Sequence, residues 1–255
     1  MTTYRQEIIG EVPEGDLALT RHGEEAASSA PAEATEILEI AIDQKTFGIR
    51  LTDTMEGRNA VSMLVNKMYA WRGYAGTQRL SDDPNRITLT ASAKDGAPVG
   101  TLTLGLDAEV GLLADELFKG EIDAYRARGA RVCELTKLAF DPTVQSKGAL
   151  ASLFHMGVMY ARDLHECTDI FIEVNPRHRR FYERMLGFTC LGEPKTNPRV
   201  NAPAYLLSVN LGYVTEQITK YGGTAGQPGT ERSFYPHFFS LREERGIIDR
   251  LLGRH

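Results

Sequence analysis

The chain has 255 residues, of which 42% are hydrophobic and 25% are charged, and its formal net charge is −5 with a sequence pI of about 5.7. This length suits one domain of about 150 to 200 residues with appendages, or two small domains, and we favour one core. The composition is that of an ordinary globular protein. The acidic balance disfavours nucleic acid as a partner, because a phosphate backbone binds basic surfaces. No signal peptide or membrane span is visible, and the three cysteines lack metal-ligand spacing, so we expect a cytoplasmic protein with reduced thiols.

The beginning of the chain differs in composition from the rest. Residues 23–36 are rich in Ala, Glu and Ser and have few large apolar side chains, so burial cannot offset the entropy lost on ordering them. We therefore expect residues 1–45 to form a mobile or loosely docked arm. Residues 46–212 should form one domain, and residues 213–255 a Gly-rich connector followed by an aromatic, helical extension.

Hydrophobic periodicity predicts the elements of this domain in chain order. They are a strand at 47–52, a helix carrying Val61, Leu64, Val65 and Met68 on one face, a hairpin at 86–106, a helical stretch at 112–129, a strand at 131–140, an amphipathic helix at 146–164, a strand at 169–174, a helix at 178–186 and a last strand near 204–211. A parallel strand–helix–strand crossover is right-handed, so the second half of this order predicts a mixed α/β sheet.

The strand at 132–140 carries two charges inside an apolar run. If its side chains alternate, Glu134 lies on one face with Val132, Thr136 and Leu138, and Lys137 lies on the other with Cys133, Leu135 and Ala139. A glutamate beside a thioester could accept the proton of an attacking ammonium group, because an α-amine is mostly protonated at neutral pH. The alternative is that both charges lie near a strand end and pair with other charges or with solvent.

Four stretches of sequence together resemble one protein family. They are YAWRGY at 69–74, CELTKLAFDP at 133–142, VNPRHRRFYERMLGF at 174–188 and SFYPHFFS at 233–240. The chain resembles the N-acyl amino acid synthases of the FeeM type, members of the GNAT acyltransferase superfamily and relatives of the acyl-homoserine lactone synthases. The resemblance implies a GNAT-type mixed sheet, splayed at its centre and flanked by helices.

The same resemblance implies an enzyme that moves a long-chain acyl group from acyl carrier protein to the α-amine of an amino acid by direct aminolysis. The donor would be the acyl-phosphopantetheine of the carrier protein, with acyl-CoA as the alternative, and no cofactor would be permanently bound. The resemblance places oxyanion stabilisation at the backbone N–H groups of Leu138 and Ala139. Tyr182 matches the tyrosine that protonates the departing thiolate, although Gly187 follows it one residue later than in the commoner pattern. Core packing is the alternative for Tyr182.

The loop before the helix at 146–164 bears on the choice of donor. Superfamily members that use coenzyme A typically carry Gln/Arg-x-x-Gly-x-Gly/Ala, whose amides hold a pyrophosphate at a helix N-terminus. Here Gln145, Ser146, Lys147 and Gly148 keep part of the pattern, but Leu150 replaces its last residue. We expect these four residues, with Lys137 and Ala139, to bind the single phosphodiester and pantetheine arm of a carrier protein. An ordinary helix start is the alternative.

Arginines gather at the start of the helix near 178–186, where the helix dipole disfavours cations. We therefore expect an acidic carrier protein to bind at Arg177, Arg179 and Arg180. The alternative is that this run of charges is only a solvated face.

For the amino-acid acceptor, Arg72 is the candidate partner of the α-carboxylate, with Trp71 and Tyr74 as pocket walls. The alternative for the two aromatic residues is packing at a helix end.

Three other functions stay open at this point. The chain could be a GNAT N-acetyltransferase that uses acetyl- or acyl-CoA on a small molecule or a protein. It could be a non-catalytic module that binds carrier protein or lipid, or a lactone synthase that uses S-adenosylmethionine. A lipid product could also draw the protein to a membrane surface.

Overall fold

The structure, a computed structural model, describes residues 38–42, 45–71, 73, 77–141, 143–144 and 146–253. Most of the expected arm, residues 1–37, lies outside the described residues. The expected boundary at residue 46 is wrong, because a hairpin already begins at Leu38 and joins the sheet.

The elements follow in chain order. They are β1 (Leu38–Ile42), β2 (Lys45–Leu51), α1 (Met55–Trp71), β3 (Arg86–Ser92), β4 (Pro98–Leu106), α2 (Asp115–Arg126), β5 (Val132–Phe140), α3 (Lys147–Met159), the π-helix η1 (Tyr160–Leu164), β6 (Asp169–Val174), α4 (Pro176–Leu186), β7 (Thr189–Asn197), β8 (Ala202–Asn210), α5 (Leu211–Tyr221), the 3₁₀-helix η2 (Tyr235–His237) and α6 (Leu241–Leu251).

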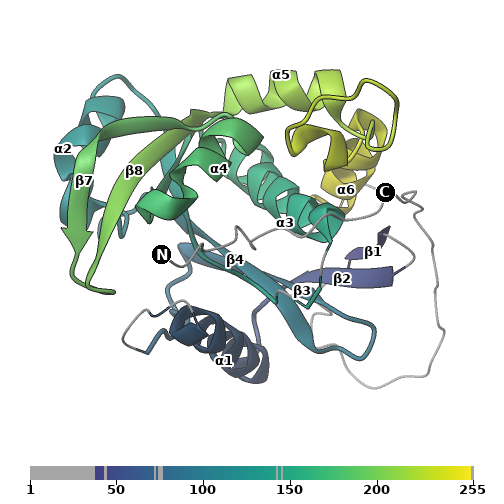
Figure 1. The fold of residues 1–255 in the computed structure, drawn as a ribbon, viewed down its shortest axis with the longest axis horizontal. Helices are drawn as coiled ribbons and strands as arrows, with labels where there is room; N and C mark the ends of the chain where they lie inside the picture. The colour runs from purple at the N-terminus through teal and green to yellow at the C-terminus, as the bar shows by residue number, and fades with distance from the viewer. Residues whose placement is uncertain are drawn as a thin grey trace, which may run out of the picture.

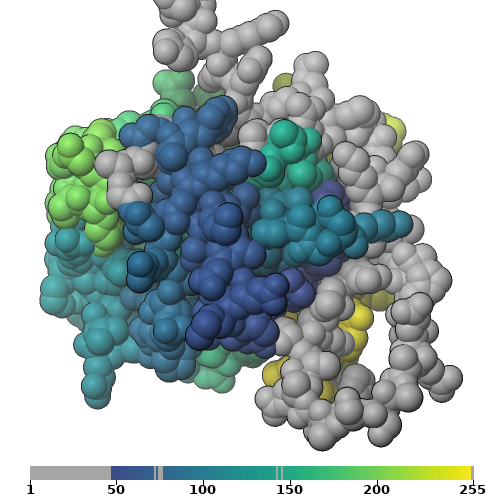
Figure 2. All heavy atoms as spheres, turned by 90° about the horizontal axis from the view of Figure 1, so that it is seen from below, coloured from purple at the N-terminus to yellow at the C-terminus, as the bar shows by residue number. Residues whose placement is uncertain are grey.

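One eight-stranded sheet has the order β1-β2-β3-β4-β5-β6-β8-β7, and its neighbouring strands are antiparallel except for the parallel pair β5 and β6. Helix α1 lies on one face, and α3 to α6 gather on the other (Figure 1). Figure 2 views the molecule from the side of α1, which runs across this face in dark blue. The mixed α/β sheet with flanking helices is the predicted fold.

Two elements were not predicted inside or just after the domain. Strand β7 contains Gly192 and Pro194 and few buried side chains, so it lacks the apolar alternation of a strand. Helix α5 occupies residues 211–221, where the sequence predicted the start of a Gly-rich connector. It begins at the side-chain cap of Asn210 and buries Leu211, Val214 and Ile218.

Helix α3 is the centre of the larger core. Of its 13 residues, 11 are buried, so it is apolar nearly all round. Such a helix needs cover on both sides. The sheet covers one side, and residues 234–239 with α6 cover the other. The C-terminal extension is therefore part of the same core.

A buried histidine attaches this extension to α3. The backbone N–H of Phe239 donates to Nδ1 of His155 over 3.0 Å, so this nitrogen carries no proton. The imidazole stacks against the rings of Phe238 and Phe239, with centroids 4.8 and 5.1 Å away. Its Nε2 lies 3.7 Å from Oε2 of Glu244 on α6. If Nδ1 of His155 were protonated, its N–H would point at the backbone N–H of Phe239, so two donors would face each other.

The Glu244 carboxylate also binds the Arg162 guanidinium of η1, which binds Asp163 and donates to Thr215 of α5 over 3.0 Å. Helices α3, α5 and α6 are thus joined through one polar network. Within the described ranges, no helix combines the length and apolar character needed to cross a membrane.

Acidification should loosen this attachment. Burial lowers the pKa of His155 below its usual value near 6.5, although Glu244 acts in the opposite direction. The unfolded chain therefore binds the proton more readily. The free energy of unfolding should be highest above about pH 6.5 and fall below it, by up to about 1.4 kcal/mol per pH unit from this group.

The variant His155→Asn keeps an acceptor near the Nδ1 position and cannot titrate. It should lose roughly 1–3 kcal/mol at about pH 8 but show a flatter pH dependence between about pH 5 and 7. Urea unfolding across this range measures both effects. A variant as pH-dependent as the original protein would contradict the assignment.

Candidate functional site

The parallel strands β5 and β6 pair only at their beginnings. Val132, Cys133 and Glu134 pair with Asp169, Ile170 and Phe171. Beyond these three pairs, residues 135–140 of β5 and 172–174 of β6 diverge, although each strand stays paired to its outer neighbour. We call this region the splay. In the splay, the backbone N–H and C=O groups that face between β5 and β6 do not pair with each other. A central splay of this kind is what the resemblance to the FeeM-type synthases implied.

A bulge in β5 lies beside the splay. The register against β4 shifts between Thr101 and Thr103, and Lys137 adopts a left-handed backbone with φ of 49°. The predicted alternation therefore fails after Thr136. Ala139 packs under α1, on the face that carries Glu134, and Nζ of Lys137 donates to the Arg79 carbonyl on that side over 2.8 Å. The expected separation of the two charges onto opposite faces is wrong.

The Glu134 side chain is 1% exposed and is held by several donors. Arg86 of β3 binds its Oε1, the N–H of Leu113 donates to the same oxygen over 2.8 Å, and the N–H of Ala114 donates to Oε2 over 3.0 Å. The carboxylate thus joins β3, β5 and the loop before α2. Burial and the Arg86 guanidinium lower the pKa of Lys137 below its usual value near 10.5.

Gly105 of β4 makes this ion pair possible. It stands between its register partners Arg86 and Glu134. A Cβ there would lie 2.0 Å from Nη1 of Arg86 and 2.9 Å from Cγ of Glu134. Only a residue without a side chain lets the guanidinium reach across the strand.

A second carboxylate lies across the splay. Glu173 of β6 is two residues beyond Phe171, the register partner of Glu134, so it shares the face of Glu134. Its Oε1 accepts from Nη2 of Arg199 over 2.6 Å, and its Oε2 accepts from Nδ2 of Asn197 over 2.5 Å. The sequence interpretation missed this residue, although a charge in the apolar run DIFIEV is the same signal that singled out Glu134.

One residue, Leu113, connects the two carboxylates through its backbone. Leu113 donates its N–H to Glu134, and its carbonyl accepts from Nη1 of Arg199 over 2.9 Å. Burial raises the pKa of Glu173 above its usual value near 4.5, and the charge of Glu134 raises it further, against the lowering effect of Arg199 and Asn197.

The opposite face of β5 and β6 carries an apolar cavity. It has a volume of about 20 Å³, room for roughly one water molecule. Residues from β5, α3, β6, α4 and the loop after it, β8, α5 and the C-terminal extension line it: Leu135, Phe154, Val158, Ile170, Leu186, Phe188, Val209, Val214, Tyr235 and Phe238. Tyr235 fixes the extension there, because its hydroxyl donates to the Leu186 carbonyl over 2.7 Å.

Tyr182 of α4 is half-buried beside this cavity. Its ring makes edge contacts with Phe154 and Phe188, two lining residues, at centroid distances of 6.3 and 5.9 Å. It therefore lies on the face opposite to Glu134 and Glu173, near the helices that follow the two splayed strands.

The helices that follow β5 and β6 both begin at the splayed edge, because the strands are parallel. Ser146 caps α3 by accepting from the N–H of Ala149 over 3.1 Å, and Gly148 is buried at its first turn while Lys147 is half-buried. Gln145 lies outside the described residues. The expected donor-binding group is thus placed only in part.

The arginines of α4 differ in their surroundings. Arg177 and Arg180 are exposed. Arg179 binds Glu183 over 2.7 Å and lies over the Tyr205 ring at 4.9 Å, so its charge is largely occupied within the protein. An exposed basic face therefore contains Arg177 and Arg180, with Arg184 one turn beyond.

The predicted acceptor residues are hardly described. Trp71 ends α1 and is 64% exposed, whereas Arg72 and Tyr74 lie outside the described residues. Their predicted roles remain predictions.

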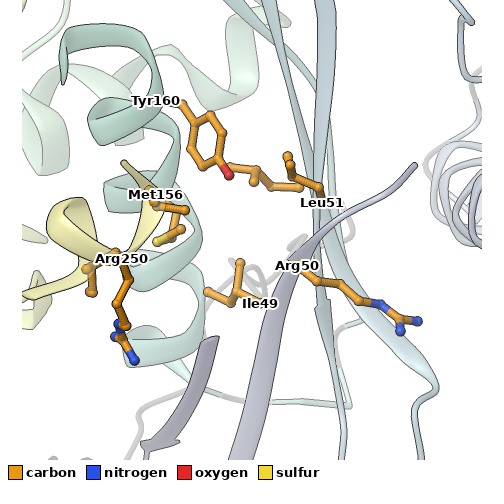
Figure 3. A pocket seen from close by; sticks show the side chains of 9 residues that line it. Ile49, Arg50, Leu51, Met156, Tyr160 and Arg250 are labelled. Atoms are coloured by element: carbon orange, nitrogen blue, oxygen red, sulfur yellow. The ribbon is translucent and has the colours of Figure 1, made fainter. Parts of the chain in front are cut away.

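Another cavity of about 20 Å³ lies between β2, α3 and α6, lined by Ile49, Met156, Tyr160 and their neighbours (Figure 3). Arg50 is on its border but points away from it (Figure 3). It is lined by the first strands of the sheet and not by β5 or β6, so it is a poor candidate for a site built on the splay.

The profile of a family described as N-acyl amino acid synthase FeeM matches residues 60–210. The chain belongs to this family. The structure of FeeM, an N-acyl amino acid synthase from uncultured soil microbes, is similar with a TM-score of 0.60 and 28% identity, over 67% of this chain and 93% of that chain. The FeeM-type family and the GNAT fold predicted from the sequence are confirmed, and the protein is an acyltransferase enzyme.

Two further solved structures have lower TM-scores against this FeeM-family chain. A mutant of the spermidine N-acetyltransferase SpeG from Vibrio cholerae has a TM-score of 0.45 and 14% identity, over 66% of this chain and 95% of that one. An acyl-CoA N-acyltransferase from Pseudomonas aeruginosa has a TM-score of 0.45 and 15% identity, over 64% and 97%. No curated protein matches the chain.

Replacing Gly105, which lies between Arg86 and Glu134, should disrupt their ion pair. Gly105→Ala forces the guanidinium and the carboxylate apart and leaves a buried charge unpaired, so we expect a loss of about 3 kcal/mol or more in the free energy of unfolding. Urea unfolding measures this loss.

Gly120→Ala is the matched control. Gly120 lies in α2 with nothing within 4 Å of an added Cβ, so alanine there should stabilise by about 0.5–1 kcal/mol. Equal effects of the two substitutions would contradict the role of Gly105.

Proposed function

We propose that this acyltransferase moves a long-chain acyl group from the phosphopantetheine thioester of acyl carrier protein to the α-amine of an amino acid, giving an N-acyl amino acid. The observation that carries this proposal is the splay, with carboxylates on one face and an apolar cavity on the other. FeeM itself is named as an N-acyl amino acid synthase. In this proposal the enzyme works in the cytoplasm, where a carrier protein supplies the donor.

The two faces suit the two ends of the product. The acyl chain enters the apolar cavity bordered by α3 and the C-terminal extension. The polar amino acid approaches from the face of Glu134 and Glu173. A volume of about 20 Å³ is far smaller than a long acyl chain, so lining side chains such as Tyr235 and Phe238 must move when the donor binds.

The reaction needs no redox partner. The acceptor ammonium loses one proton, and the nitrogen lone pair then attacks the thioester carbonyl carbon. The C–S bond of the tetrahedral intermediate breaks, and the thiolate takes up the second proton released from nitrogen. We assign the oxyanion to backbone N–H groups of β5 at Leu138 and Ala139, next to the Lys137 bulge. Tyr182 gives its hydroxyl proton to the thiolate and regains the second nitrogen proton, so the net transfer is from nitrogen to sulfur.

Two features favour a carrier protein as the donor. The loop before α3 lacks the last small residue of the coenzyme A pattern, and Leu150 occupies that position. The exposed arginines of α4 start at the same edge as the splay and carry charge complementary to an acidic partner.

A donor and acceptor screen tests the proposed function. Purified protein is incubated with each amino acid and with dodecanoyl to hexadecanoyl thioesters of either carrier protein or coenzyme A, and the amides are identified by mass spectrometry. We expect amide from the carrier-protein thioesters, with coenzyme A thioesters at least about 10-fold poorer in kcat/KM. Exclusive use of coenzyme A thioesters removes the carrier protein from the proposal, and absence of any amide removes the synthase activity.

Charge reversal on α4 tests the docking face. The double variant Arg180→Glu with Arg184→Glu should raise the KM for carrier-protein thioesters roughly 10-fold at low salt, because exposed ion pairs contribute up to about 1 kcal/mol each. Turnover of short pantetheine thioesters should not change, and added salt should shrink the difference.

Arg245→Glu on α6 is the control, since Arg245 is an exposed arginine of another helix. An equal effect of this control, or an equal loss with short pantetheine thioesters, would show that α4 does not dock the carrier.

A further inference from the structure

Glu134 is a poor proton acceptor in this geometry. Three donors occupy its two oxygens, and 1% of the residue is exposed. A carboxylate offers about four lone-pair sites, so little capacity is left for an ammonium group. Accepting a proton would also set the carboxyl O–H against donors already in place.

Glu173 is better suited to that task. Among the described residues, each of its oxygens accepts from one donor, Arg199 or Asn197, so each keeps a further lone-pair site. Its side chain is 12% exposed, which leaves an approach from solvent. It lies on β6 where that strand has left β5, on the face of the splay opposite to the apolar cavity.

We infer that Glu173 is the general base that takes the proton from the ammonium group of the acceptor, while Glu134 is a positioning residue that holds the loop carrying Leu113. This inference rests on the proposed function. The proton moves from nitrogen to a Glu173 oxygen before the amine attacks, and it passes to water after the amide has formed. The second nitrogen proton leaves with the thiol.

Burial and the charge of Glu134 assist such a role. They raise the pKa of Glu173 toward the pH at which the enzyme works, which makes the carboxylate a stronger base. Arg199 and Asn197 keep enough of the charged form available and fix the orientation of the carboxylate.

The pH dependence of Glu173→Gln tests the inference. In the original protein, kcat should rise with pH as Glu173 loses its proton, with a midpoint above the usual glutamate value near 4.5. The variant should lose about 100-fold or more in kcat, keep its KM for the acyl donor, and lack this rise. The increase caused by the acceptor's own amine, above about pH 7, should remain.

Glu116→Gln is the matched control. Glu116 binds the same guanidinium of Arg199 over 2.5 Å, but it lies on α2 and is 47% exposed. It should keep kcat and the pH profile. If Glu116→Gln falls as far as Glu173→Gln, the effect comes from the position of Arg199 and the inference is overturned.

A second variant covers the case in which Glu173→Gln does not fold. Asn197→Ala keeps the carboxylate but removes one of its donors, which should raise the pKa of Glu173 and move the rise in kcat to higher pH. An unchanged midpoint would overturn the inference.

Two results distinguish failure of this inference from failure of the proposed function. If the original protein forms amide and Glu173→Gln is equally active, only the inference is wrong. If the original protein forms no amide with any donor, the proposed function is wrong as well.

Discussion

The buried Glu134 carboxylate is the constraint on which the site depends. It is bound by Arg86 from β3 and by two backbone N–H groups of the loop before α2. A buried charge is stable only when it is paired and hydrogen-bonded. Separating β3, β5 and the loop before α2 would therefore leave a buried carboxylate without partners, which costs several kcal/mol of folding free energy. It lies at the last β5–β6 pair, so its hydrogen bonds hold β5 to β3 and to the loop before α2 at the point where the strands diverge.

The sheet at this point separates two chemical environments. One face of the splay has carboxylates, guanidinium groups and the Lys137 bulge. The other has aromatic and aliphatic side chains from α3, α4, α5 and the C-terminal extension. A molecule with a charged head and an apolar tail is bound well only if it crosses from one face to the other, and in a β-sheet that crossing requires two strands that do not pair.

Much of this arrangement could be predicted from the sequence, because strong periodicity marks the central hairpin, β5, α3 and β6. The alternation of β5 gave the right face for residues 132–136 but failed at Lys137, since a bulge depends on register against β4 and leaves no mark in a single strand. Glu173 carries the same local signal as Glu134, yet its value comes from Arg199 and Asn197, which are distant in the sequence. Strand β7 was missed because its pairing with β8 overrides weak propensity.

Part of the lining of the apolar cavity comes from residues near the C-terminal end of the chain, which are synthesised last. Tyr235 and Phe238 come after both the last strand, β8, and helix α5 in the sequence. They complete a cavity lining whose other members belong to β5, α3, β6, α4, β8 and α5. Until these residues leave the ribosome, an open groove of leucine, valine and phenylalanine faces water on an otherwise finished sheet. Such surface favours association with other chains. A chain that lacks the extension would therefore expose the apolar side chains that Tyr235 and Phe238 cover.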